Sequence, residues 1–307
     1  MSKINSAGGM RYRRLGRTEI SVSELAFGSH LKKTNIADRE GRRRQIEVGI
    51  EQGISLFDIY EHSYQQFEPM SEALAGVREE VVISLVTVWR AADEVMDEVE
   101  YALKVFGRDS IDLFRLVFTG DWDDSEQRLQ ALVKAKEQGK IRSVGCVVHY
   151  PEHLLEGFRR YADEVEYAMV PASFCAPLLL RKERALAAEI GRLDVGVIAM
   201  KPMAAADQEG GYIFKLKPDS EELADLEQKG LRLGKLAVKY LLQSDVVSCV
   251  LPAMNSVAEV LENASASGDG PLTGEEERFL EIYREEAEKV FPEMLREDNY
   301  WVTPWKG

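Results

Sequence analysis

Short apolar runs rich in β-branched residues alternate with longer stretches of helical period from about residue 20 onward. This alternation is typical of repeated βα units that build a parallel sheet. The predicted strands are Glu24–Phe27, Ile54–Asp58, Val81–Val86, Ile111–Val117, Ile141–Val147, Glu166–Val170, Val195–Ala199 and Ser248–Leu251. The predicted helices include Gly41–Gln52, Asp93–Phe106, Ser125–Gln138, Arg181–Arg192, Leu231–Gln243 and Ser256–Ser265. Eight such strands with intervening helices predict one closed (β/α)8 TIM barrel.

No Pro/Gly/Ser-rich linker divides the chain of 307 residues, so we expect a single domain with the barrel over 24–266. Before it, residues 10–23 predict a β-hairpin that covers the amino-terminal end of the barrel. After it, residues 273–307 predict an amphipathic helix, capped at Thr273 with Glu276, and a tail. The tail contains Tyr300, Trp301 and Trp305, which we expect to dock on the barrel or a second subunit, or to close over a substrate.

The chain is acidic, with 39 Lys and Arg against 53 Asp and Glu and a formal net charge of −14. That balance excludes a large phosphate-binding surface, so nucleic acid and anionic membranes are not expected partners. No apolar run approaches the roughly 18 residues of a membrane span, and the start lacks a signal peptide's apolar region. We therefore expect a cytoplasmic protein. Cys146, Cys175 and Cys249 are spaced unlike a metal or disulfide motif and predict reduced, buried thiols.

Several segments occur in the order and spacing of one enzyme family. They are the hairpin followed by Glu24–His30 (ELAFGSH), Phe57–Asp58, Ser71–Leu74 (SEAL), Ile111–Phe114 (IDLF), Gly139–Gly145 (GKIRSVG), Val197–Pro202 (VIAMKP) and Leu251–Ser256 (LPAMNS) through Glu262–Asn263. Over about residues 10 to 265 the chain thus resembles the aldo/keto reductase family, in particular the branch whose seventh strand ends in MKP. The resemblance implies a (β/α)8 barrel, a nicotinamide cofactor, and oxidoreductase activity on a small carbonyl compound or sugar.

The resemblance also implies a catalytic set of Asp, Tyr, Lys and His, and this chain departs from it. Asp58 stands at the Asp position, whereas Val86 and Val117 occupy the Lys and His positions. Ser63 falls at the Tyr position, with Tyr64 one residue later, so an inserted residue could still bring its hydroxyl into the pocket. General acid catalysis typically contributes about 10²–10⁴-fold, and we therefore expect the loss of Lys and His to weaken ordinary carbonyl reduction.

The cofactor positions implied by the resemblance are changed as well. Val147, Val148 and Met169 stand where the family holds the nicotinamide amide through polar side chains. The expected cofactor-binding residues are Asn263, Glu259, Ser256, Met200 and Lys201. Glu259 stands where an Arg or Gln usually faces the adenosine ribose or its phosphate. Since an acid repels a 2′-phosphate, NAD is favoured over NADP if a dinucleotide still binds.

Strand alternation predicts a replacement for the missing cation. If Val117 points into the barrel, Arg115 does too, and a buried guanidinium needs an acid partner, for which Asp58 is the candidate. An error of one residue in the register would instead turn Arg115 toward the helices.

Three histidines follow predicted strands: His30, His62 and His149. Because active sites of such barrels lie at the carboxyl ends of the strands, these residues could perform acid/base chemistry together with Asp58, Glu61 and Tyr64. Solvated loop histidines are the simpler explanation, and we expect His153 to face solvent. The same residue types suit zinc, iron or manganese, although the spacing matches no metal motif and a metal is not expected. Asp121, Asp123 and Asp124 could bind a polyol or a cation, or cap a helix at Asp124 or Ser125.

Three hypotheses follow. The first is an atypical reductase that uses a nicotinamide cofactor and a rebuilt acid. The second is a cofactor-independent or metal-assisted lyase, isomerase or epimerase that acts on a sugar-like carbonyl through His, Asp and Tyr. The third is a non-catalytic binding subunit. A homo-oligomer is compatible with each of them.

Overall fold

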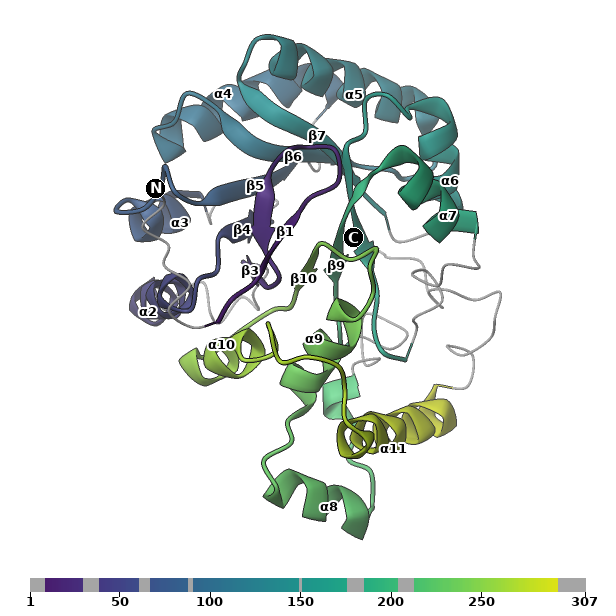
Figure 1. Cartoon of the computed structure of the whole chain (residues 1–307). Helices are drawn as coiled ribbons and strands as arrows, with labels where there is room; N and C mark the ends of the chain where they lie inside the picture. The colour runs from purple at the N-terminus through teal and green to yellow at the C-terminus, as the bar shows by residue number, and fades with distance from the viewer. Residues whose placement is uncertain are drawn as a thin grey trace.

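The computed structural model describes residues 9–29, 39–60, 67–87, 91–148, 151–175, 185–203 and 213–291. Eight parallel strands pair in chain order around a barrel (Figure 1). They are β3 (Ala26–Gly28), β4 (Leu56–Ile59), β5 (Val82–Thr87), β6 (Ile111–Val117), β7 (Ile141–Val147), β8 (Tyr167–Pro171), β9 (Gly196–Met200) and β10 (Cys249–Leu251). Parallel bridges from Leu25 to Val250 and from Gly28 to Ala253 join the two edges. The predicted (β/α)8 barrel is therefore confirmed.

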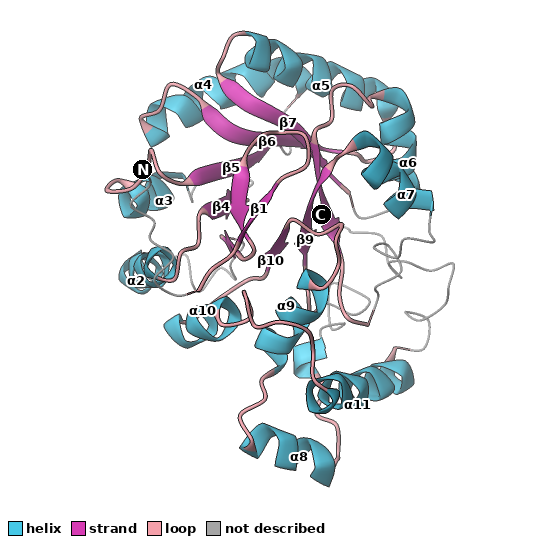
Figure 2. Cartoon of the chain, in the orientation of Figure 1, coloured by secondary structure: helices cyan, strands magenta, loops and turns pink. Residues whose placement is uncertain are grey.

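Helices surround the strands on the outside (Figure 2). They are α2 (Arg39–Glu51), α3 (Phe67–Leu74), α4 (Val95–Phe106), α5 (Trp122–Glu137), α6 (Pro151–Arg160), α7 (Ala185–Leu193), α8 (Glu221–Gln228), α9 (Leu233–Leu242), α10 (Val257–Ala264) and α11 (Gly274–Val290), with short 3₁₀ turns η1 (Ala92–Glu94) and η3 (Ile213–Lys215). Helices α3, α6 and α8 were not among the helices named from the sequence.

The amino-terminal hairpin closes one end of the barrel. Strands β1 (Tyr12–Arg14) and β2 (Ser21–Ser23) pair antiparallel, and Gly16 bridges to Val195 immediately before β9. Gly16 has φ +52°, and a Cβ there would lie 2.0 Å from the backbone nitrogen of Gly196, so only glycine fits. The hairpin also places Leu15, Ile20 and Val22 in the apolar interior of the barrel. Chemistry is therefore confined to the opposite, carboxyl-terminal end.

Helix α11 packs on α8 and α9 through residues that include Phe279, Leu280 and Tyr283. The predicted cap is confirmed: the Thr273 hydroxyl accepts from the Glu276 N–H, and the Glu276 carboxylate accepts from the Thr273 N–H at 2.8 Å. The aromatic residues of the tail, Tyr300, Trp301 and Trp305, lie outside the described residues.

The core has two main layers. One fills the space between strands and helices, and the other fills the barrel. The three cysteines are free and buried, as predicted, and burial raises the pKa of the Cys175 thiol to about 12. Among the described residues, none of the helices is both long and apolar enough to span a membrane.

Candidate active site

The carboxyl-terminal end of the barrel is lined by apolar side chains. Because side chains alternate along each strand, one set points inward at this end. The inward set, here called the mouth, consists of Tyr60, Val86, Val117, Val147, Met169, Met200 and Leu251. Tyr60 and Val117 are its partly exposed members. A ligand that enters between these side chains meets mostly hydrocarbon.

An ion pair lies beneath the mouth. Arg115 on β6 holds Asp58 on β4 with both terminal nitrogens, at 2.6 Å to Oδ1 and 3.1 Å to Oδ2. The Ser84 hydroxyl on β5 donates to Asp58 Oδ1 at 2.8 Å and accepts from Arg115 at the same distance. The Arg115 and Asp58 side chains are 1% and 4% exposed. The pair that strand alternation predicted is thus present, with bidentate geometry that a planar guanidinium is suited to make.

The polar layer continues across the barrel to Tyr167 on β8. Gly145 on β7 is the ladder neighbour of both Arg115 and Tyr167, and its missing side chain leaves room for the Tyr167 ring. The ring is fully buried, and burial raises the pKa of its hydroxyl, although the nearby Arg115 acts in the opposite direction. Tyr167 is therefore a poor proton donor at neutral pH, and we regard the layer as a support for the mouth above it.

Replacing Gly145 by alanine is expected to destabilise the fold by about 1–3 kcal/mol. The added Cβ would lie 2.4 Å from the nearest Tyr167 ring carbons, and a ring buried on all sides cannot move aside cheaply. Urea unfolding measures the loss. A second change, Tyr167→Leu, should recover part of it, and equal stability of Gly145→Ala and the unaltered protein would show that the ring has room to shift.

Helix α10 begins after the carboxyl-terminal end of β10, at the same end of the barrel as the mouth. Ser256 is the N-cap residue, and its hydroxyl accepts from the Glu259 N–H at 3.2 Å. The Glu259 carboxylate turns back and accepts from the Asn255 N–H at 2.7 Å. A negative charge thus already lies at the positive end of this helix. Asn263, one turn further on, is 3% exposed and lies close to Gly234 at the start of α9.

Lys201 follows Met200 directly at the end of β9. Its φ of +61° lies in the left-handed region, which is unusual for a residue other than glycine and ends the strand's alternation there. Burial lowers the pKa of its amine from 10.5 to about 8. The residue that follows β9 is therefore a lysine whose amine is partly desolvated.

Comparisons with known proteins identify the relatives of this chain. The sequence profile of the aldo/keto reductase family matches residues 25–281. The chain belongs to this family. It is 21% identical over 301 residues to the uncharacterized oxidoreductase YqkF of Bacillus subtilis, covering 89% of this chain and 96% of that protein.

Two solved structures of the family superpose on most of the chain. Aldo-keto reductase AKR11C1 from Bacillus halodurans is 25% identical, with a TM-score of 0.66 and coverage of 89% of this chain and 96% of that one. An aldo/keto reductase from Brucella melitensis is 15% identical, with a TM-score of 0.67 and coverage of 89% and 99%, and supports the fold alone.

The charged groups of this site lie below the mouth and not in it. Val86 and Val117, at the positions that the sequence resemblance assigns to the family's Lys and His, point into the barrel with the other mouth residues. Arg115 pairs with Asp58 from β6, the strand adjacent to the β5 position of Val86. The carboxylate therefore keeps a cation, but the cation comes from another strand and lies below the mouth.

Tyr60 is a mouth residue that the sequence analysis missed. It follows Asp58 by two residues, so the alternation that placed Arg115 inward also places Tyr60 inward, one level above the carboxylate. Its backbone N–H donates to the Ser29 hydroxyl at 3.0 Å, which anchors the end of β4 to the end of β3. Tyr60 is thus the tyrosine that the described part of the chain brings to the mouth.

Five of the expected site residues fall outside the described residues: His30, Glu61, His62, Tyr64 and His149. Their convergence on the mouth stays a prediction. His153 corrects an expectation, because it is half-buried and packs edge-on against Trp122, with ring centroids 6.2 Å apart, instead of facing solvent. The reason is the turn at Gly120, whose missing side chain lets the His153 ring approach.

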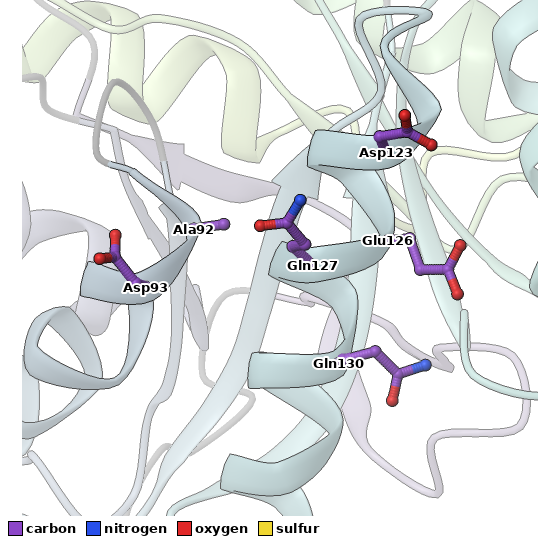
Figure 3. A pocket seen from close by; sticks show the side chains of 6 residues that line it. All are labelled: Ala92, Asp93, Asp123, Glu126, Gln127 and Gln130. Carbon is purple, nitrogen blue, oxygen red and sulfur yellow. The ribbon is translucent and has the colours of Figure 1, made fainter.

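The acidic residues after β6 cap a helix. Asp121, not Asp124 or Ser125, is the N-cap of α5 and accepts from the Asp124 N–H at 3.1 Å. Asp123 faces an open surface groove between η1 and α5, in which Asp93 lies across from Gln127 (Figure 3). Within the described ranges, no group of three or more His, Cys, Asp or Glu residues is placed to hold a metal ion.

Proposed function

We propose that this aldo/keto reductase is an NADH-dependent enzyme that reduces a small, apolar carbonyl compound. The observation that carries the proposal is the start of α10, where the Glu259 carboxylate is folded over the helix amino terminus. The sequence resemblance assigns this position to the adenosine half of the cofactor. The family generally uses NAD(P)H and acts on small carbonyl substrates. The hydrocarbon lining of the mouth favours an apolar carbonyl over a sugar, whose hydroxyls would lose hydrogen bonds to water there.

The described residues offer polar groups to the adenosine end of the cofactor and apolar contact to its nicotinamide end. At the adenosine end, Ser256, Glu259 and Asn263 supply polar groups, and the carboxylate disfavours the 2′-phosphate of NADP. At the nicotinamide end, Val147 and Met169 offer only apolar contact to the ring and no partner for its amide. We therefore expect the adenosine half to contribute most of the binding energy and the cofactor to bind weakly for this family.

The residues of this chain have two kinds of role: some position the site, and others take part in the reaction. The bound cofactor supplies a hydride. Arg115 and Asp58 neutralise each other, hold three neighbouring strands in register below the mouth and act as positioning residues. Tyr60 and Tyr64 are the candidates for donating a proton to the carbonyl oxygen. Since neither Val86 nor Val117 can replace the family's Lys and His, we expect slow turnover.

The cofactor part of the proposal is tested by titrating the purified protein with NADH and NADPH. We expect NADH to bind at least about tenfold more tightly, which corresponds to about 1.4 kcal/mol. Glu259→Arg should narrow or reverse this preference, because a cation would attract the 2′-phosphate. Glu277→Arg on α11 makes the same charge change far from α10 and should leave the preference unaltered. Equal affinities for both cofactors, unmoved by Glu259→Arg, would refute the assignment.

A second candidate is proton transfer on a carbonyl compound without hydride transfer, as in a lyase, isomerase or epimerase. The inward-facing Val86 and Val117 favour it, because they remove the groups with which the family protonates a carbonyl during reduction. Failure to bind either nicotinamide at millimolar concentration, together with loss of turnover in His62→Ala or His149→Ala, would support this candidate. Retention of all turnover in both variants would instead show that these histidines do not transfer the proton.

A further inference from the structure

We propose that Arg42 on α2 is a positioning residue that holds Glu259 in place at the start of α10 and thereby sets the cofactor preference, an inference that rests on the proposed function. Helices α2 and α10 pack side by side outside the seam where β3 and β10 close the barrel (Figure 1). The Arg42 guanidinium donates to the Gly28 carbonyl at the end of β3 at 2.9 Å and to the Met254 carbonyl after β10 at 3.2 Å. Arg42 therefore joins the two strand ends at the point where the chain turns into α10.

The guanidinium of Arg42 is buried without the carboxylate that Arg115 has. Arg42 is 6% exposed, burial lowers its pKa to about 10, and no carboxylate of the described residues opposes that shift. Besides the two carbonyls, its contacts are the Gln45 amide oxygen at 3.0 Å and the face of the Phe27 ring, whose centre lies 4.4 Å from the guanidinium carbon. Burying a cation in this way is costly, and an apolar side chain of similar size would avoid the cost. We therefore attribute the arginine to the carbonyl groups that it orients.

The Met254 carbonyl connects Arg42 with Glu259. In a planar trans peptide group, the C=O and the N–H that follows it point in opposite directions. Arg42 holds the Met254 carbonyl on the side of α2, so the Asn255 N–H points away from α2. The Glu259 carboxylate accepts from that N–H at 2.7 Å. The orientation of one peptide group thus depends on Arg42 and decides where the carboxylate is held.

Gln45 extends the same arrangement by one residue. It lies one helical turn after Arg42, on the same face of α2, and its amide nitrogen donates to the Asn255 carbonyl at 2.9 Å. Two successive carbonyls before the N-cap residue Ser256 are therefore held from α2. Without these donors the turn is free to rotate, and the Glu259 carboxylate loses the N–H that fixes it over the start of α10. A carboxylate that is no longer fixed there repels a 2′-phosphate less strongly, because the repulsion falls with distance.

Amide hydrogen exchange of the full chain, followed by NMR, tests the positioning without any cofactor. We expect the Asn255 amide to exchange at least about threefold faster in Arg42→Met and in Gln45→Met, because the turn loses hydrogen bonds that hold it. Arg44→Met, on the same helix, alters an arginine that is 55% exposed and should leave this rate unaltered. The amides of α5 serve as a reference for loosening of the whole fold, and Gln45→Met decides the matter if Arg42→Met folds poorly. An unchanged Asn255 rate in the folded variants would overturn the proposal.

Cofactor titration tests the effect on preference. We expect the ratio of the NADPH to the NADH dissociation constant to fall at least about threefold in Arg42→Met, and Arg42→Lys, which keeps a cationic donor, to restore part of it. In a Glu259→Gln background, Arg42→Met should leave the ratio unchanged, since its effect passes through that carboxylate. An equal effect of Arg42→Met with and without the carboxylate would contradict the proposal. Binding of neither cofactor by the unaltered protein would refute the proposed function instead, and exchange of the Asn255 amide then decides whether Arg42 positions Glu259.

Discussion

Replacing Arg115 by methionine is expected to lower the free energy of unfolding by about 3–5 kcal/mol. Methionine fills much of the space of the arginine stem but leaves the Asp58 carboxylate, 4% exposed, without its cation. The Ser84 hydroxyl donates to the carboxylate but carries no charge. Urea unfolding followed by circular dichroism measures the effect, and total stabilities of about 5–15 kcal/mol make such a loss easy to detect.

The matched controls separate charge from packing. Arg44→Met alters an arginine that is 55% exposed and should change stability by no more than about 0.5 kcal/mol. Asp58→Asn combined with Arg115→Met removes both charges and should be more stable than Arg115→Met alone. If the double variant is as unstable as the single one, the loss comes from packing and not from an unpaired carboxylate.

Replacing Val86 by lysine is expected to destabilise the protein by at least about 3 kcal/mol, although lysine is the residue type that the sequence resemblance assigns to this position. Val86 is 2% exposed and is the ladder neighbour of Arg115, so the new ammonium would lie beside a guanidinium that already neutralises Asp58. Two cations would then share one carboxylate in a buried layer. Thermal or urea unfolding measures the loss.

The double variant Val86→Lys with Arg115→Met tests whether the cation can return to its family position. One cation then faces one carboxylate, so we expect stability above that of either single variant and a coupling energy within about 0.5–3 kcal/mol. Losses that simply add would show that Val86 and Arg115 do not compete for Asp58. With a carbonyl screen, the same double variant also shows whether a lysine in the mouth raises the rate of reduction.

These expectations have one structural cause. A lysine at the position of Val86 would lie in the mouth, whereas Arg115 lies deeper and is enclosed by Asp58, Ser84 and Leu85. An always-charged, bidentate guanidinium stabilises the layer but cannot exchange a proton. Any proton donor must therefore come from the mouth, where Tyr60 is the described candidate.

The ion pair shows how far sequence reasoning reaches at this site. Period-two alternation put Arg115 and Val117 on one face of β6, and the cost of burying an unpaired guanidinium required an acid. Asp58 followed because it had lost its family lysine. The same alternation, extended two residues beyond Asp58, also places Tyr60 inward, so the position of Tyr60 was predictable from the sequence.

Other features of the structure could not be predicted from the residues next to them in the sequence. The left-handed backbone at Lys201 follows the last ladder pairs of β9 with β8 and β10, and burial in the folded chain desolvates its amine. The approach of His153 to Trp122 depends on a gap left by Gly120, and the place of Tyr167 depends on the absent side chain of Gly145. None of these neighbours is close in sequence, and composition alone does not reveal which strands adjoin.

The sequence by itself determined the eight strands, the covering hairpin, the capped terminal helix and the ion pair. These follow from residue period, from capping chemistry and from the cost of buried charge, which act over short stretches or pair complementary groups. Only the tertiary structure decided how deep the ion pair lies, which side chains line the mouth, and that the amine of Lys201 is desolvated. Those properties depend on contacts among strands far apart in the chain, because burial and pKa are set by everything that surrounds a group in space.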